Sequence, residues 1–321
     1  MKATAIAHPI QGLIKYHGLK DSRLRIPFHD SISVCVNALY TSTTVEATES
    51  LREDSVIING KKALGAELER VKVILNKLRS IADYSGRFKV VSQNSITRGK
   101  GLGFSASGFA ALGTAACEAL GFDIDYIVLS ELVRLGAGSA TRSLAGSFAI
   151  WYANKNGKSY AEQIVEPGDV DLGIVVVSAP SSIRTDEAHK EVLSSPLFKA
   201  RLKYVAGIIK AMEKAVKSGD VATIGRLAEE DSLNLHAITM TGKAHMVLWE
   251  PETIRTIKEV QRMQNEGIPV WYSLDTGPSV FVNTFTDCVE MVADRLRGLG
   301  FSNIITSKVG DKPFLSSKHL F

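Results

Sequence analysis

The sequence has few cysteines, no long apolar run and almost no charge imbalance, and each absence excludes a class of protein. Its three cysteines, among 321 residues, include no CxxC pair, so neither a disulfide scaffold nor a structural zinc site is indicated. The longest apolar run, residues 172–180, is too short to span a bilayer and is typical of a buried strand. The N-terminus shows no signal-peptide pattern. We therefore expect a cytoplasmic protein with no membrane partner.

Charge is nearly balanced, with 38 Lys and Arg against 34 Asp and Glu and a formal net charge of +4. The basic residues are scattered among acids, which argues against a nucleic-acid partner. Hydrophobic residues make up 45% of the chain, too many for a disordered protein. Because one core is near its practical limit at this length, we expect two lobes, comprising residues 1–181 and 182–321.

Strand-like patterns dominate the first part of the chain and helical patterns the second, which predicts an α+β fold rather than a doubly wound sheet. Residues 31–40 and 43–48 alternate polar and apolar side chains, and this predicts a pair of antiparallel strands with one solvated face. An Asn-Gly turn signal ends a predicted strand at residues 55–60. Further strands are predicted at 88–96, 270–275, 280–283 and 303–309, and helices at 63–82, about 106–120, 196–219, 224–239, 251–267 and 288–299.

A glycine-rich segment, GKGLGFSASGFAALGTAACEAL, begins at Gly99. Its glycines permit a tight turn, and the small residues at 105–108 let a ligand approach the main chain. The helix that follows presents unsatisfied N–H groups and a positive dipole end, which suit phosphate oxygens. The segment matches neither a Walker loop nor a dinucleotide fingerprint. Phosphate binding is predicted, with a closely packed helix entry as the alternative.

Three charged residues lie in settings that suit chemistry. Arg142 is surrounded by small residues, which leaves room for a planar anion, although an ordinary surface arginine is the alternative. Asp275 ends an apolar strand before a Gly-Pro turn, as a catalytic carboxylate or as the cap of that turn. Lys15 could place an ammonium beside an acid. The seven histidines show no HxxxH or HExxH spacing, so we expect no metal held by the protein.

Taken in order, four segments resemble motifs of the mevalonate diphosphate decarboxylase family within the GHMP kinase superfamily. They are IKYHGL (14–19), GLGFSA (101–106), GSATRS (138–143) and DTGPS (275–279). DSLNLHA (231–237) is similar to the family's helix motif, and SSIRTDEA (181–188) to its substrate loop. The resemblance spans nearly the whole chain. It implies a two-lobed GHMP kinase fold, with an N-terminal lobe like ribosomal protein S5 domain 2, an α/β C-terminal lobe and the active cleft between them. A homodimer is usual in the family.

The resemblance also implies a reaction, an ATP-dependent phosphorylation followed by decarboxylation, with Mg²⁺ held mostly by nucleotide phosphates and water. Asp275 matches the aspartate that faces the substrate's tertiary 3-hydroxyl, and Lys15 the lysine that keeps this aspartate ionised. Arg142 matches the arginine that binds the substrate carboxylate. Ser105 matches the serine that contacts the γ-phosphate. The expected ATP-binding residues are Ser92, Asn94, Gly101, Leu102, Gly103, Ser105, Ala106 and Ser107, with the Asn59–Gly60 turn as a further candidate for adenine.

Departures from the family motifs concern the substrate. Members that act on a diphosphate carry a second lysine where this chain has Leu19, a tryptophan in place of His17 and a serine in place of Ala137. The loss of one cation and one hydroxyl favours a smaller anion. Tyr16, His17, Ser139 and Arg184 are left to bind a single phosphate. Residues 3–18 also resemble phosphomevalonate decarboxylases of archaea and some bacteria. We therefore expect (R)-5-phosphomevalonate as the substrate and isopentenyl phosphate as the product.

Three alternatives stay open. One is a decarboxylase that acts on mevalonate 5-diphosphate, and another is a mevalonate 3-kinase that stops after phosphorylation. The third is a non-catalytic relative with a degenerate nucleotide site. Retention of Lys15, Arg142 and Asp275 together favours the full decarboxylase, although Phe104 replaces a serine of the family's phosphate loop.

Overall fold

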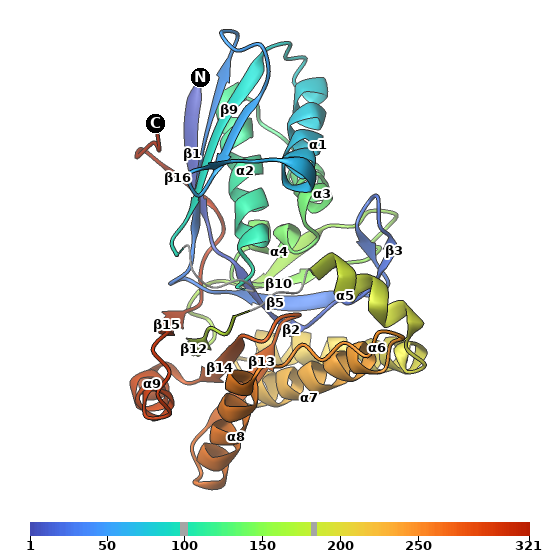
Figure 1. Cartoon of the computed structure of the whole chain (residues 1–321), viewed down its shortest axis with the longest axis vertical. Helices are drawn as coiled ribbons and strands as arrows, with labels where there is room; N and C mark the ends of the chain where they lie inside the picture. The colour runs from blue at the N-terminus through green and yellow to red at the C-terminus, as the bar shows by residue number, and fades with distance from the viewer. Residues whose placement is uncertain (97–101, 181–184) are drawn as a thin grey trace.

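The computed structural model describes residues 1–96, 102–180 and 185–321, which form an upper and a lower part in the view of Figure 1. The described strands are β1 (Lys2–Ala7), β2 (Ile10–Ile14), β3 (Leu19–Asp21), β4 (Ile26–Pro27), β5 (Ser31–Cys35), β6 (Thr41–Thr48), β7 (Ser55–Ile58), β8 (Lys61–Lys62), β9 (Arg87–Asn94), β10 (Phe148–Trp151), β11 (Ala161–Val165), β12 (Gly173–Val177), β13 (Val270–Leu274), β14 (Val280–Thr284), β15 (Ile304–Lys308) and β16 (Phe314–Ser316). The helices are α1 (Gly65–Ile81), α2 (Phe104–Leu120), α3 (Tyr126–Gly136), α4 (Ala140–Ala145), α5 (Thr185–Glu191), α6 (Phe198–Lys217), α7 (Val221–Met240), α8 (Pro251–Asn265) and α9 (Val289–Arg297), with 3₁₀ turns η1 (Val192–Ser194) and η2 (Thr286–Cys288).

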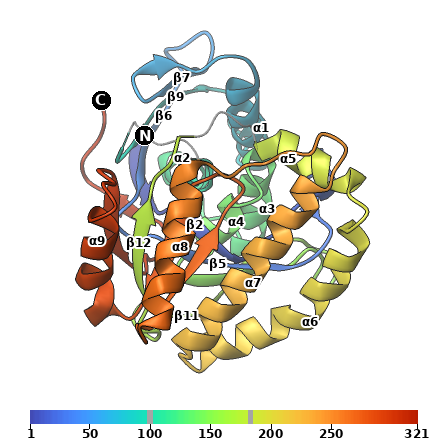
Figure 2. The same cartoon turned by 60° about the horizontal axis from the view of Figure 1, so that its bottom comes forward.

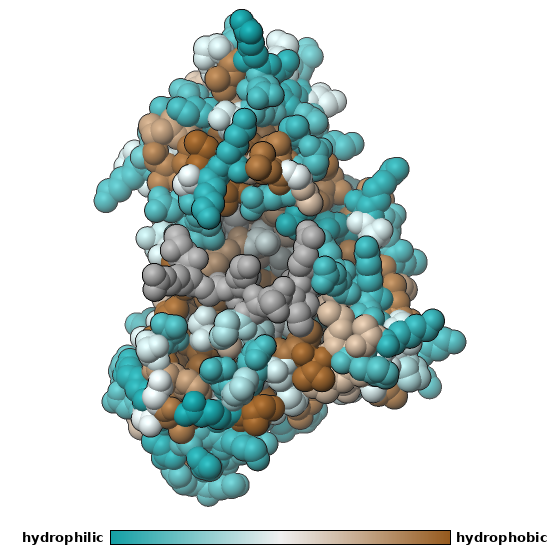
Figure 3. Space-filling model, in the orientation of Figure 1, coloured by the Kyte–Doolittle hydropathy of each residue, from teal (hydrophilic) through white to brown (hydrophobic). Residues whose placement is uncertain are grey.

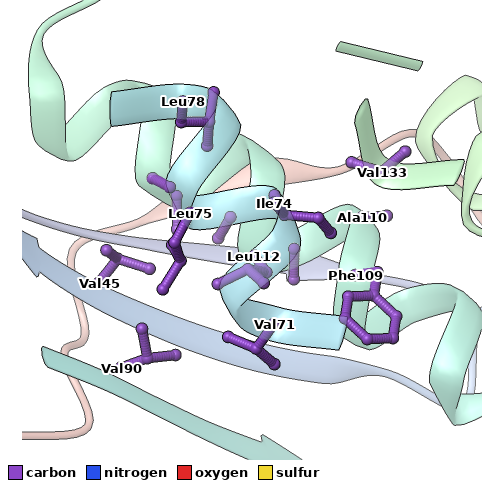
Figure 4. Packing of buried hydrophobic residues seen from close by; sticks show 14 of the residues in the cluster. Val45, Val71, Ile74, Leu75, Leu78, Val90, Phe109, Ala110, Leu112 and Val133 are labelled. Atoms are coloured by element: carbon purple, nitrogen blue, oxygen red, sulfur yellow. The ribbon is translucent and has the colours of Figure 1, made fainter. Parts of the chain in front are cut away.

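The upper part is built on a six-stranded sheet in the order β16-β1-β6-β9-β7-β8. Helices α1, α2 and α3 lie on one side of this sheet (Figure 1). Because side chains alternate along a strand, β6 and β9 direct Val45 and Val90 toward the helices, where they meet Leu75 of α1 and Leu112 of α2 (Figure 4). Full burial of such a side chain stabilises the fold by about 1.5–3 kcal/mol. This core supports the start of α2, where phosphate binding is predicted.

Two four-stranded sheets follow below the upper part. The middle sheet has the order β11-β10-β5-β2, and the third sheet has the order β13-β14-β12-β15. Helix α7 packs against both β2 and β13, so it connects the middle sheet with the third. Helices α6 and α7 pack on each other, while α8 contacts β13 and β14 and α9 contacts β12 and β15 (Figure 2). Strand β2 leads into Lys15 and strand β13 leads into Asp275, so the segments that carry these two residues pack against the same helix.

The predicted α+β class is confirmed, and each predicted helix is present with ends shifted by a few residues. The predicted pairing of the strands at 31–40 and 43–48 is wrong. Strand β5 lies between β10 and β2 in the middle sheet, whereas β6 lies between β1 and β9 in the upper sheet. All residues of β5 are buried, including Ser31 and Ser33, so its expected solvated face is also absent. An alternating pattern reports the period of a strand but does not identify its partner.

The sheets do not divide at residue 181, where the sequence predicts the lobe boundary. Strand β12, which precedes that point, pairs with β14 and β15 in the third sheet. Near the other end of the chain, β16 returns to the upper part and pairs with β1. Both termini therefore lie in the upper part (Figure 1). The sequence after β12 is rich in Pro and Ser, and such a stretch marks the end of a strand but carries no information on its sheet.

The face of the molecule that Figure 3 shows carries mainly hydrophilic residues, with smaller apolar areas among them. Within the described parts of the chain, no helix combines the length and apolarity needed to cross a membrane. All three cysteines are free thiols, and Cys35 and Cys117 are buried, as expected for small core residues.

Candidate active site

A cavity of about 560 Å³ lies where the upper and lower parts meet. Strand β2, the start of α2, helices α4 and α5 and the turn after β13 contribute to its wall. The predicted site residues that line it are Lys15, Tyr16, Asn94, Leu102, Gly103, Ser105, Ser139, Arg142 and Asp275. Two further predicted residues, Gly101 and Arg184, lie outside the described residues. The fold thus gathers residues that are more than 200 positions apart in the sequence.

An ion pair between Lys15 and Asp275 lies in this cavity. Lys15 Nζ is 2.7 Å from Asp275 Oδ1, and the Gly12 N–H donates a hydrogen bond of 3.0 Å to the same oxygen. None of the described residues donates to Oδ2, and the side chain of Asp275 is 12% exposed. A Cβ on Gly12 would lie 2.9 Å from Oδ1, so only glycine permits this approach. Burial lowers the pKa of Lys15, while Asp275 opposes the shift and favours the ammonium form.

Helices α6 and α7 hold the backbone of Lys15 in place. The Lys15 N–H donates to Asp231 Oδ2 at 2.8 Å, and Arg201 Nη2 donates to the Lys15 carbonyl at 2.6 Å. Asp231 and Arg201 also form an ion pair of 3.0 Å, with side chains 2% and 0% exposed. Both polar groups of the Lys15 peptide are thus bound by one buried pair. Arg201 has no counterpart among the sequence motifs and was not predicted.

Helix α7 also holds the backbone at Asp275, the other member of the ion pair. The Leu274 N–H donates to Ser232 Oγ at 2.9 Å, and His236 Nε2 lies 3.1 Å from the Asp275 carbonyl oxygen. Because a carbonyl only accepts, His236 donates from Nε2. The segment DSLNLHA was predicted as a helix motif by resemblance alone. Its polar side chains position Lys15 and Asp275 from one rigid element.

Arg142 is a buried cation with incomplete pairing. It is 1% exposed, and its guanidinium lies over the rings of Tyr16 and Trp151, at 5.4 and 5.8 Å from their centroids. Its Nε and Nη1 have no hydrogen-bond partner among the described residues. Burial lowers the pKa of Arg142 to about 10, so the group stays charged at neutral pH. A buried charge without a partner is costly, which fits a site that receives an anion.

His189 of α5 lines the cavity beside Tyr16 and was missed by sequence reasoning. The two rings stack with centroids 5.0 Å apart. His189 Nδ1 accepts a hydrogen bond of 3.1 Å from the Gly18 N–H, so the neutral ring carries its proton on Nε2. His17, which was predicted to contact substrate, is fully buried against His189 and is not among the described residues that line the cavity. Neither ring nitrogen of His17 has a partner within the described parts of the chain.

The start of α2 is the place where the sequence predicts phosphate binding. Gly103 precedes the helix with a φ of +74°, a conformation that favours glycine, and a Cβ there would lie 3.1 Å from the Ile10 carbonyl. No side chain caps this helix end, so its first N–H groups remain available to a ligand. Ser105 is exposed on the first turn, whereas Ala106 and Ser107 are buried and do not line the cavity.

A second cavity of about 150 Å³ adjoins the first, and the residues that line both are Asn59, Glu67, Arg70, Asn94, Phe104 and Ser105. Ser92 lines only this second cavity. The remaining wall is mostly apolar and includes Val56, Val71, Val90, Phe109 and Leu112. The residues predicted to contact adenine are thus brought together around a small, largely apolar space. A space of this kind suits a planar base.

No group of three or more His, Cys, Asp and Glu within residues 1–96, 102–180 and 185–321 is placed to hold a metal ion. The cavity does hold carboxylates of Asp275, Asp186 and Glu67, which come from three separate elements.

Buried histidines predict an acid-sensitive fold. Burial lowers the pKa of His29 and His236 to about 4 and that of His189 to about 3. In the unfolded chain these groups have a pKa of about 6.5, so below that pH the unfolded state binds protons that the folded state does not. Stability is therefore complete above pH 6.5 and is lost as the pH falls toward 4. Between pH 7 and 5 we expect a loss on the order of 1–2 kcal/mol per histidine, measured by urea unfolding.

A matched pair of variants checks this prediction. His29→Gln removes one partly buried histidine outside the cavity and is expected to reduce the loss of stability between pH 7 and 5. His245→Gln changes an exposed histidine and is expected to leave that loss unchanged. Equal losses in the two variants would contradict the prediction.

The fold and the cavity define a two-lobed enzyme with a Lys-Asp pair, a buried arginine and a helix start suited to phosphate. The model of the diphosphomevalonate decarboxylase-like N-terminal domain matches residues 7–161, and that of the mevalonate 5-diphosphate decarboxylase C-terminal domain matches residues 174–314. The chain therefore belongs to the mevalonate diphosphate decarboxylase family, whose members are ATP-dependent decarboxylases of the mevalonate pathway.

Individual relatives are similar over almost the whole chain. A phosphomevalonate decarboxylase from Haloferax volcanii is 40% identical over 302 residues, which cover 94% of this chain and 93% of that protein. The crystal structure of mevalonate diphosphate decarboxylase from Staphylococcus aureus matches with a TM-score of 0.92 at 28% identity and covers 98% of both chains. A solved complex of the protein called MDDEF with MVAPP, AMPPCP and magnesium matches with a TM-score of 0.90 at 28% identity and covers 99% of both chains.

Proposed function

We propose that this enzyme converts (R)-5-phosphomevalonate and ATP to isopentenyl phosphate, ADP, phosphate and CO₂, as a step of isoprenoid biosynthesis. The assignment of a monophosphate substrate depends on the residues around Tyr16 at the cavity wall. Leu19, which replaces the second lysine of the family motif, packs against the cluster of Tyr16, Ala145 and Trp151 and is not among the described residues that line the cavity. Ala137 lines the cavity without a hydroxyl. The similarity to the Haloferax volcanii enzyme supports the same substrate.

The first step is phosphorylation of the tertiary 3-hydroxyl. Asp275 orients this hydroxyl and accepts its proton through Oδ2, since Oδ1 is occupied by Lys15 and Gly12. The ammonium group of Lys15 pairs with this carboxylate and balances its charge, and an ionised carboxylate is the form that can accept a proton. The rigid attachment of both residues to α7 supplies positioning, and positioning is the main requirement of phosphoryl transfer.

The nucleotide occupies the adjoining surface. The N–H groups at the start of α2 and the hydroxyl of Ser105 bind the phosphates, and Leu102 and Gly103 precede this helix start at the cavity wall. Adenine enters the second cavity between Ser92, Asn94 and Asn59. Magnesium is held mostly by the phosphates and water and neutralises charge during transfer. The MDDEF complex with AMPPCP and magnesium supports this requirement.

The second step is loss of CO₂. Arg142 binds the substrate carboxylate through its guanidinium group, which includes two donors, Nε and Nη1, that lack partners among the described residues. Departure of the 3-phosphate draws the electron pair of the C1–C2 bond into a new double bond, and the carboxylate leaves as CO₂. Tyr16, Ser139 and Arg184 bind the 5-phosphate, while His17 supports the ring of His189.

The substrate preference is directly measurable. We expect kcat/KM for CO₂ release from 5-phosphomevalonate to exceed that from mevalonate 5-diphosphate by at least about tenfold, which corresponds to the loss of about one charge-assisted hydrogen bond. Measurement uses the purified enzyme with ATP, magnesium and each substrate. Equal or reversed kcat/KM values would instead support a decarboxylase that acts on mevalonate 5-diphosphate. Accumulation of a stable 3-phosphorylated product without CO₂ would identify a 3-kinase, and failure to bind an ATP analogue would identify a non-catalytic relative.

A further inference from the structure

A cation that the family motifs do not include faces the same cavity from the β3–β4 hairpin. Arg25 lies at the end of the turn between these strands and lines the cavity together with Tyr16 and His189. It is six positions after Leu19, the place of the absent lysine, and on the same hairpin. The hairpin thus lacks the family's lysine at position 19 in β3 but has a cation, Arg25, in its turn.

The turn that carries Arg25 is held in a defined conformation. Arg25 itself has a φ of +53°, which is uncommon for a residue with a side chain. The Leu24 N–H donates to Asp21 Oδ1 at 2.8 Å, and Arg134 Nε of α3 donates to the Leu24 carbonyl at 2.9 Å. Arg134 is 5% exposed, so this anchor is part of the interior. The backbone that carries Arg25 is therefore held in place by these contacts without a ligand.

In this structure the partner of Arg25 is Asp186 of α5. Arg25 Nη2 is 2.8 Å from Asp186 Oδ1, and the two side chains are 15% and 50% exposed. The cation is mostly buried, whereas its carboxylate partner is half in solvent. An ion pair of this kind is weak and is readily exchanged for a stronger anion. A phosphate offers several oxygens to the planar fork of an arginine, which makes it the stronger partner.

We propose that Arg25 is a specificity-determining residue that exchanges Asp186 for the terminal phosphate of the substrate, and that Asp186 disfavours substrates with a longer, more highly charged phosphate chain. The inference rests on the proposed function, because it assigns the phosphate group of that substrate. Arg25 replaces the charge absent at Leu19, and the carboxylate of Asp186 at the cavity wall repels the additional charge of a diphosphate. Selectivity then arises from attraction of one anion and repulsion of another.

The test uses three variants and two readouts. Arg25→Gln is expected to raise KM for 5-phosphomevalonate at least about tenfold while kcat changes less than about twofold, since the lost contact lies far from the reacting carbon. Arg23→Gln is the matched control, because Arg23 is an exposed residue of the same turn that is not among the described residues lining the cavity. Arg25→Lys is expected to restore part of the affinity. Asp186→Asn is expected to lower KM for the monophosphate and to reduce the discrimination against the diphosphate.

Direct binding separates a structural role from the proposed one. By calorimetry, the Arg25→Gln variant is expected to bind 5-phosphomevalonate more weakly than the wild type does. Its affinity for mevalonate, which lacks the phosphate, is expected to be unchanged. Equal KM values for Arg25→Gln and Arg23→Gln, or a loss of kcat with a lowered unfolding temperature instead of a raised KM, would overturn the role of Arg25. Unchanged selectivity in Asp186→Asn would overturn the role of Asp186. A wild-type preference for the diphosphate would instead overturn the proposed function and, with it, the role of Asp186.

Discussion

Replacement of Asp275 with asparagine is expected to lower kcat about 10³-fold. Asparagine keeps the size of the side chain, and its oxygen can still accept from the Gly12 N–H, but the amide cannot take the proton of a tertiary alcohol. General-base catalysis contributes typically 10²–10⁴-fold, and the variant loses it entirely. The amide also leaves the buried Lys15 ammonium without its counter-ion. Release of CO₂ from 5-phosphomevalonate measures the effect.

Two controls separate chemistry from folding in this experiment. Affinity for an ATP analogue is expected to stay within about twofold of wild type, because the nucleotide site is built on α2 and the second cavity. Asp287→Asn changes an exposed aspartate of the same lower part and is expected to leave kcat unchanged. An Asp275→Asn enzyme that still releases CO₂ at the wild-type rate would remove Asp275 from its proposed role.

Replacement of Arg142 with methionine is expected to stabilise the protein while it abolishes most of the activity. Two of the guanidinium's donors are buried without a partner among the described residues, and each such group costs about 1–3 kcal/mol. Methionine has a similar volume and no charge. The free energy of unfolding of the ligand-free protein should therefore rise by about 1–3 kcal/mol for each unpaired donor removed. Loss of a bidentate contact to the carboxylate should lower kcat/KM about 10²-fold or more.

Arg201→Met is the control, because this variant is expected to lower the free energy of unfolding. Arg201 is buried to the same 1% exposure as Arg142, but it is paired with Asp231 at 3.0 Å. Its removal leaves Asp231 as an uncompensated buried charge, which destabilises a protein by about 3–5 kcal/mol. Urea unfolding of the ligand-free variants compares the two. A destabilised Arg142→Met protein would contradict the view that Arg142 is held in readiness for an anion at the expense of stability.

Much of the site could be predicted because its chemistry is carried by short, contiguous motifs. Lys15, Ser105, Arg142 and Asp275 were each identified from their own segment and meet in the cavity. Turn glycines, a helix start and a strand end are local features, so a sequence pattern can report them. The same holds for the helices, whose apolar spacing predicts them within a few residues.

Predictions failed where the answer depends on a distant segment. Strand β5 was assigned to the wrong partner, since it lies between β10 and β2 and not beside β6. His17 was expected to face substrate from its place in the motif, yet it packs in the interior against His189. No local pattern reports which segment covers a side chain, because burial is decided by packing between elements.

The sequence by itself determined the α+β class, the helices and four chemical motifs, since each depends on residue type and spacing along a short stretch. Only the tertiary structure decided which groups act together. It attached Lys15 and Asp275 to one helix through Asp231, Ser232 and His236. It also paired Arg25 with Asp186, 161 positions away. Ion pairs and burial depend on distances in space, and the chain sets those distances only when its sheets have assembled.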